Sequence, residues 1–180
     1  IETLVIPTLS SDSLLSYYAV PYLGCENLKT LEASYSDLKR IDNEAFATIT
    51  HAIVSQGASV GELHDESETL KKITYGLGVT SISSIGNGAV TEVVILNKDV
   101  EISSRTELFG GYRLSVERVV LPAGMQTLPA KMFYGASAVK SVVLPTAITE
   151  IPSYFFYNCT TLESVEIPAG VPTIGDKAFR

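Results

Sequence analysis

The sequence contains little charge, and what it has is mostly acidic. Charged residues make up 18% of its 180 residues, and the formal net charge is −7. Basic residues stand next to each other only as pairs, at Lys39-Arg40 and Lys71-Lys72. Nucleic acids and anionic membranes both attract clustered Lys and Arg. The composition therefore argues against either as a partner.

Long apolar runs are also missing. No stretch approaches the roughly 18 residues of a membrane-spanning helix, so we expect no membrane span in this segment. The first residue is Ile rather than Met, so any signal peptide is already removed or lies outside the segment. Apolar residues nonetheless make up 46% of the chain, enough for one buried core. We predict a single domain over residues 1–180.

Motifs of catalysis and cofactor binding are scarce. The P-loop, H-E-x-x-H and C-x-x-C patterns do not occur. Glycines in 76–78 and 86–88 are interpreted as turn formers, because no long helical pattern follows them. The stretch 55–69 is interpreted as a solvated acidic loop, because its possible metal ligands lack the EF-hand spacing; they are Glu62, His64, Asp65, Glu66 and Glu68. We predict no catalytic residue, no metal and no cofactor.

Repetition is the strongest positive signal. The segments VERVVLP (116–122), VKSVVLP (139–145) and LESVEIP (162–168) start 23 residues apart and keep their apolar residues while the polar ones change. Counted from each start, positions 1, 4 and 6 are apolar, position 7 is proline and position 18 is phenylalanine. Weaker copies, with an irregular stretch over 47–115, complete a set of units that start near Ile1, Leu28, Ile49, Leu70, Val90, Val116, Val139 and Leu162.

One unit is expected to form a strand, a turn and a return segment. Positions 4 and 6 share one face of an extended chain, and the following proline ends the strand. Pro129 and Pro152 suit the start of a helical turn, and Asp42 can cap one. Stacked units bury a continuous core that a single unit cannot. The fold class is thus an α/β solenoid of the leucine-rich-repeat type, a right-handed coil with short parallel strands on one face and short helical or irregular returns on the other.

The C-terminal units closely resemble the BspA-like leucine-rich repeat family, whose units run approximately LxxIxLPxxVxxIxxxAFxxCxx. The resemblance is specific over 116–180 and recognisable in LKTLEASYSDLKRIDNEAF, residues 28–46. It implies an adhesion-associated protein that is secreted or displayed on a cell surface. Its partner would be a protein of a host or neighbouring cell.

The cysteines are expected to be two free, largely buried thiols. Cys25 and Cys159 occupy equivalent places six units apart, which is on the order of 29 Å at about 4.8 Å per strand. A disulfide needs Cα atoms within roughly 7 Å.

Positions 3 and 5 of each strand should point outward, onto the surface that curved solenoids commonly use for binding. The predicted binding residues on this face are His51, Lys72, Glu92, Val94, Arg118, Val120 and Val143. The stripe Val94, Val120 and Val143 has two interpretations: ordinary strand propensity, or a docking patch for a protein. His51 lies in the strand HAIV and is interpreted as a sheet-surface residue rather than a catalytic base.

Two further features leave alternatives open. Segment 10–24 contains Tyr17, Tyr18 and Tyr22: either Tyr18 and Leu23 or near neighbours fill the core slot that Phe156 fills elsewhere, or the tyrosines form an exposed aromatic patch. Neither end shows the polar cap that terminal repeats carry, so the chain is expected to be a piece of a longer array or to associate end to end with another copy.

For function, the leading hypothesis is a non-enzymatic protein-binding or adhesion module. The others are a structural spacer and a carbohydrate-handling protein that uses the irregular 47–115 region.

Overall fold

The computed structural model describes residues 2–5, 27–39, 41, 47–61, 63, 67–85, 89–102, 108–109 and 115–180. Several predictions from the sequence concern residues outside these ranges: Tyr17, Tyr18, Tyr22, Cys25, Asp42, Glu62, His64, Asp65, Glu66 and the glycine pattern at 86–88.

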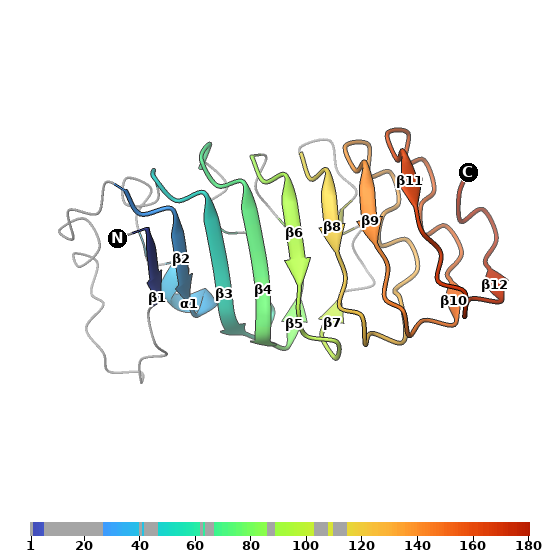
Figure 1. Cartoon of the computed structure of the whole chain (residues 1–180), viewed down its shortest axis with the longest axis horizontal. Helices are drawn as coiled ribbons and strands as arrows, with labels where there is room; N and C mark the ends of the chain where they lie inside the picture. Colours follow the sequence, from blue (N-terminus) through green and yellow to red (C-terminus); the bar gives the residue numbers. More distant parts are fainter. Residues whose placement is uncertain are drawn as a thin grey trace.

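An eight-stranded parallel sheet runs the length of the molecule (Figure 1). Its strands follow one another in chain order, from the N-terminal end to the C-terminal end. They are β1 (Thr3–Val5), β2 (Thr30–Ala33), β3 (His51–Gly57), β4 (Lys72–Val79), β6 (Glu92–Ile95), β8 (Arg118–Val120), β9 (Ser141–Val143) and β11 (Ser164–Val165). The predicted leucine-rich-repeat solenoid is confirmed.

The strands pair in the register that the repeat pattern predicts. The fourth positions of the units form one continuous file of register partners: Leu4, Leu31, Ala52, Ile73, Val93, Val119, Val142 and Val165. A shift of one residue would turn this file to the outer face, so burial of one face specifies the register. The file is buried from β2 to β9.

The core lies between the sheet and the return segments. Behind the strands, a column of stacked aromatic rings joins successive coils through Phe109, Phe133, Phe156 and Phe179. Neighbouring ring centroids in this column lie 4.7, 5.2 and 5.2 Å apart. Stacked aromatic pairs contribute about 0.5–1.5 kcal/mol beyond the burial of their area. These phenylalanines, which recur at intervals of 24, 23 and 23 residues, therefore tie each of these coils to the next.

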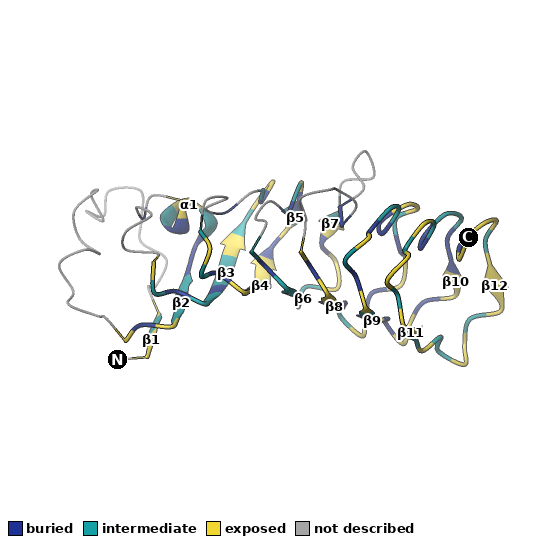
Figure 2. Ribbon diagram, turned by 90° about the horizontal axis from the view of Figure 1, so that it is seen from above, coloured by how far each residue is buried: buried dark blue, intermediate teal, exposed yellow. Residues whose placement is uncertain are grey.

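The return segments contain little helix, which corrects the expectation of helical turns after Pro129 and Pro152. Residues 130–135 and 153–158 form turns. The helix that the described residues contain is α1 (Tyr35–Leu38), whose N-cap Ser34 accepts a hydrogen bond from the Asp37 amide. Other returns pair as short parallel strands: β5 (Ser81–Ile82) with β7 (Glu101–Ile102), and β10 (Glu150–Ile151) with β12 (Thr173–Ile174). Viewed from above, α1, β5 and β7 lie across the coil from the main sheet (Figure 2).

The turns of successive returns are also joined by backbone hydrogen bonds that run in one direction. The amide of Phe133 donates to the carbonyl of Phe155 (3.1 Å), and the amide of Phe156 donates to the carbonyl of Ala178 (2.8 Å). Donors thus belong to one coil and acceptors to the next. These bonds satisfy backbone groups of the irregular returns without a helix.

From the sequence, Gly76 and Gly78 were interpreted as turn residues, and this was wrong. Both belong to β4. The register of β3 and β4 shifts between Val54 and Gln56. There the backbones come so close that a Cβ on Gly78 would lie 2.6 Å from the Ser55 carbonyl oxygen. Glycine permits this close approach of the backbones. Because β3 extends to Gly57, the predicted loop 55–69 begins with strand residues.

Candidate functional site

The outer face of the main sheet brings the predicted binding residues together. Strand register places Lys72, Glu92 and Arg118 side by side in one row, with His51 next to Lys72. The neighbouring row places Val94, Val120 and Val143 side by side. We call these seven residues the outer-face site. They come from the five adjacent strands β3, β4, β6, β8 and β9.

The charged row of the outer-face site forms a connected ionic group. Glu92 lies between two cations: its carboxylate is 3.3 Å from Lys72 Nζ and 3.5 Å from Arg118 Nε. The Glu92 side chain is 30% exposed and that of Arg118 is 51% exposed. Exposed ion pairs are individually weak, but networks hold their geometry better than isolated pairs. The row therefore offers a partner an ordered pattern of charge.

His51 is held by a neighbouring strand. Its Nε2 lies 2.9 Å from Thr74 Oγ1 in β4. Partial burial, reinforced by the nearby Lys72 ammonium, lowers the pKa of the imidazole below its usual 6.5. The environment of His51 therefore favours the neutral imidazole. The predicted surface placement is confirmed, and the ring serves as a hydrogen-bonding group of the sheet face.

The valine stripe is less exposed than the pattern predicts. Val143 is 42% exposed, but Val94 and Val120 are half-buried, and Thr74, which continues the row on β4, is buried. The first two valines lie beside the long side chains of the charged row, whereas Val143 has the short Ser141 two residues before it on β9. The open apolar part of the outer-face site is thus its β9 end.

Two hollows lie away from this face. One, of about 680 Å³, is lined by residues 98–102 and 124–129. Its Lys98 already pairs with the adjacent Asp99, at 2.7 Å. The other, of about 250 Å³, lies at the C-terminal end of the solenoid and is lined in part by Phe156, Cys159 and Phe179.

Cys159 is a free thiol, as predicted, but is half-buried rather than largely buried. Its Sγ donates a hydrogen bond to the Phe133 carbonyl oxygen at 2.9 Å. Burial raises the pKa of the thiol to about 11. The thiolate is the reactive form, so this cysteine is a structural filler rather than a nucleophile.

Residues 57–61, GASVG, form a G-x-S-x-G motif that was overlooked in the sequence. Ser59 has a φ of 53°, and its amide donates to Ser81 Oγ at 2.6 Å. In a nucleophile elbow the serine connects a strand to a helix. Here Val60 instead forms a parallel bridge with Ile82, and the described histidine, His51, bonds Thr74 at the other end of β3. The motif lacks the context that catalysis needs.

Metal ligands do not gather in the described part of the chain, where no group of three His, Cys, Asp or Glu residues is placed to hold an ion. The cluster around His64 falls outside that part. Within the same described residues, no helix has the length and apolar character needed to cross a membrane.

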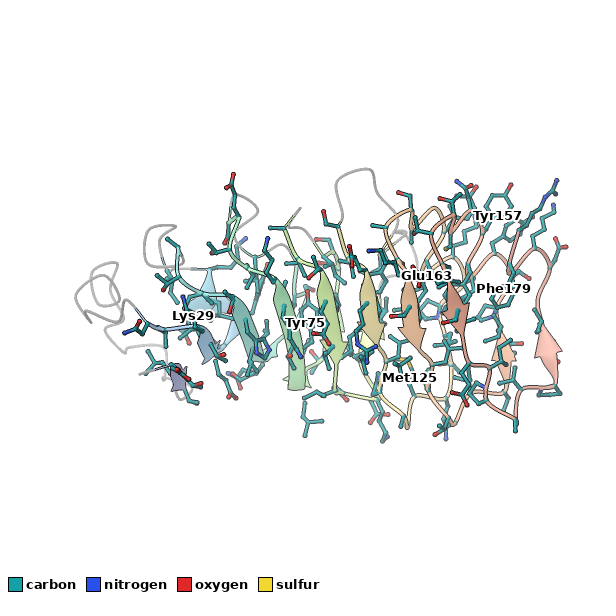
Figure 3. All side chains as sticks on the ribbon, turned by 45° about the horizontal axis from the view of Figure 1, so that its top comes forward. Lys29, Tyr75, Met125, Tyr157, Glu163 and Phe179 are labelled. Carbon is teal, nitrogen blue, oxygen red and sulfur yellow. The ribbon has the colours of Figure 1, made fainter. Side chains whose placement is uncertain are left out.

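A second surface group went unnoticed in the sequence. Lys131, Tyr134, Tyr154, Tyr157 and Lys177 meet on the return side of the last three coils, and we call them the lysine–tyrosine cluster. Aligning the units shows that Lys131, Tyr154 and Lys177 share one repeat position and that Tyr134 and Tyr157 share another, but it does not show that the two positions meet. In Figure 3, Tyr157 lies at the outer margin of these coils, and Phe179 lies nearer the sheet.

Comparison with known proteins supports the architecture. Residues 102–180 match the family model described as "BspA type Leucine rich repeat region (6 copies)". A leucine-rich repeat protein from Eubacterium ventriosum has a similar crystal structure, with a TM-score of 0.51, 23% identity, and coverage of 86% of this chain and 41% of that one. The chain thus spans less than half of that protein. No curated protein sequence matches the chain.

A leucine-rich repeat protein from T. pallidum is also similar, at 15% identity and a TM-score of 0.45, over 97% of this chain and 73% of that one. Leucine-rich repeat proteins are commonly protein-interaction modules and typically not enzymes, and the BspA type is typically secreted or displayed on the surface. The repeat positions of residues 102–180 agree with the family model, and the remaining described strands continue the same parallel sheet. Residues 102–180 thus match the BspA type of leucine-rich repeat, and the described chain as a whole has the fold of a leucine-rich-repeat solenoid.

Proposed function

We propose that the chain is a non-enzymatic protein-binding module of a secreted or cell-surface protein, and that its partner binds the outer-face site. The partner would be a protein on the surface of a host or neighbouring cell, and binding would serve adhesion. The observation that carries the proposal is the register that sets the valine stripe beside the ionic row of Lys72, Glu92 and Arg118.

This arrangement suits a protein partner for two reasons. Val143 supplies exposed apolar area where the stripe is open, and apolar anchors provide much of the affinity at protein interfaces. The paired charges beside it supply orientation, because complementary charge mainly gives specificity and association rate.

The test is a charge substitution that leaves the core untouched. Val143→Asp should abolish retention of surface proteins by the immobilised domain. Val5→Asp is the matched control, since Val5 occupies the same repeat position on β1 and is 56% exposed. Equal retention by both variants and the unmodified domain would remove the outer-face site from consideration. Absence of any retention by the unmodified domain would favour the spacer function instead.

The carbohydrate-handling alternative depends on the 47–115 region. It would be supported if soluble oligosaccharides protected that region from hydrogen exchange while Val143→Asp had no effect.

The last coil exposes apolar residues that either a further repeat of a longer array or a second copy of the chain would cover. Ile174 and Phe179 there are 54% and 45% exposed, although their counterparts Ile151 and Phe156 are buried. If copies stack through this coil, Phe179→Asp should lower the mass measured by light scattering at high concentration. A protein that is monomeric at every concentration contradicts the stacking.

A further inference from the structure

We propose that the lysine–tyrosine cluster is a second binding surface, separate from the outer-face site, and that it binds an extended acidic peptide segment. The cluster lies on the return side of the coils, whereas the outer-face site lies on the sheet. The cluster differs from the outer-face site in its residues and in the chemistry of the partner that it would bind.

The backbone at these residues is unusual in a periodic way. Lys131, Tyr154 and Lys177, spaced 23 residues apart, have φ angles of 61°, 60° and 53°. The left-handed conformation costs a non-glycine residue roughly 1–2 kcal/mol. Four residues later the same conformation recurs at Gly135 and Asn158, residues that adopt it readily. At one of the two left-handed positions the repeat thus has residues that adopt this conformation readily, glycine and asparagine. At the other it keeps long side chains, lysine and tyrosine.

Those side chains form a layered arrangement along the solenoid. The ammonium of Lys131 lies 5.9 Å from the ring centroids of both Tyr134 and Tyr154. The ammonium of Lys177 lies 5.4 Å from the Tyr154 centroid and 3.2 Å from the Tyr154 hydroxyl oxygen. Such cation–π contacts hold the two lysines against the rings.

The arrangement of the tyrosine rings argues against sugar binding, in which a sugar stacks on the open face of an aromatic ring. Tyr134 and Tyr157 stack on each other with centroids 4.9 Å apart and ring planes 10° apart, and Tyr154 lies near both lysine ammonium groups. Ring faces turned toward neighbouring coils are poor platforms for a neutral sugar. What remains for a ligand is a set of hydrogen-bond donors, the ammonium groups and the hydroxyls, and this set favours anionic groups.

The charges of the cluster are largely available to a ligand. Lys131 is exposed and forms no ion pair in the part of the chain that the structure describes. Lys177 donates to the Tyr154 hydroxyl, and its ion pair with Asp176 is long, at 3.9 Å. Residues 131–180 contain four basic and four acidic residues, so their net charge is zero, whereas the rest of the chain carries the whole −7. The cluster is thus a local cationic site on an otherwise acidic protein.

Spacing favours a peptide in the extended polyproline II conformation. The stacked rings of Tyr134 and Tyr157 belong to successive coils, so their separation of 4.9 Å gives the rise of the solenoid per coil. Lys131 and Lys177 are two coils apart and are therefore separated by about 10 Å along the solenoid axis. A polyproline II helix rises about 3.1 Å per residue with three residues per turn, so side chains at i and i+3 lie on one face about 9.3 Å apart. Acidic side chains at i and i+3 therefore match the two lysines.

The experiment measures binding of labelled peptides to the whole chain by fluorescence anisotropy. The probe is a proline-rich peptide with glutamates at i and i+3, compared with the same peptide carrying glutamines and with one carrying glutamates at i and i+2. We expect the i, i+3 acidic peptide to bind tightest, with affinity that falls as salt is added.

The variant Lys131→Asn with Lys177→Asn removes both ammonium groups while placing asparagine at left-handed positions that it tolerates. We expect it to keep the thermal stability of the unmodified chain and to lose about tenfold in peptide affinity. Lys140→Asn is the matched control, because Lys140 pairs with Glu117 at 2.9 Å away from the cluster. Val143→Asp, which tests the outer-face site, should leave peptide binding unchanged.

Several results would overturn the proposal. One is equal binding of the glutamate and glutamine peptides. Another is an equal loss of affinity in the Lys140→Asn control. A third is displacement of the peptide by a sulfated polysaccharide that binds more tightly, which would assign the cluster to glycans.

Discussion

Tyr75 of β4 lies in register with Val54 of β3, so a phenol occupies a core position that the neighbouring strands fill with aliphatic side chains. Tyr75 is fully buried, and among the residues that the structure describes its hydroxyl has no hydrogen-bond partner. Burial raises the pKa of this hydroxyl far above its usual range. The position of Tyr75 inside the coil is labelled in Figure 3.

Tyr75→Phe should therefore stabilise the protein. The substitution keeps the ring and removes a polar group whose burial without a partner costs about 1–3 kcal/mol. We expect a higher denaturation midpoint in urea with an unchanged slope. Tyr75→Ala is the companion variant and should lower the free energy of unfolding by about 3–5 kcal/mol through the cavity that it leaves. A lower midpoint for Tyr75→Phe would show that the hydroxyl is bonded in solution.

Gly78→Ala should destabilise the junction of β3 and β4. The new methyl group would lie 2.6 Å from the Ser55 carbonyl oxygen, so the two backbones must separate, at a cost of about 1–3 kcal/mol. Gly170→Ala provides a control in open space, since no heavy atom of the described residues lies within 4 Å of the place that its methyl group would take. Thermal unfolding of both variants checks this prediction, and equal midpoints would contradict the close approach.

Stability should depend on pH through His51. Its pKa is lowered in the folded chain by burial and by Lys72, so the unfolded chain binds a proton more readily. As pH falls from about 6.5 toward the folded-state pKa, the unfolded state gains protons first and folding becomes less favourable. His51→Gln should flatten this part of the stability curve in urea titrations between about pH 5 and pH 7. If the free energy of unfolding changes with pH as steeply in His51→Gln as in the unmodified chain, the pH dependence belongs to other groups.

The repeat pattern predicted the fold well because apolar side chains that face a stacked core must recur at a fixed interval. Val119, Val142 and Val165 form one file for that reason. It predicted the neighbours on the outer face equally well, since register determines which strands place residues side by side. It was wrong about the depth of Val94 and Val120, because exposure depends on the length of adjacent side chains such as Glu92 and Arg118.

The return segments were the least predictable part. Their turns are held by hydrogen bonds to the next coil, such as that from Phe156 to Ala178, rather than by local helix signals. Gly76 and Gly78 were interpreted as turn residues because a contact with a neighbouring strand leaves no mark in the local sequence.

By itself, the sequence determined that the chain coils into stacked units with a parallel sheet on one face, because the period of its apolar residues allows a buried core only in that arrangement. Tertiary structure alone decided which polar side chains become a surface group. Lys131, Tyr134 and Tyr154 meet because a left-handed turn and the height of one coil bring them together, and neither quantity can be read from residue types.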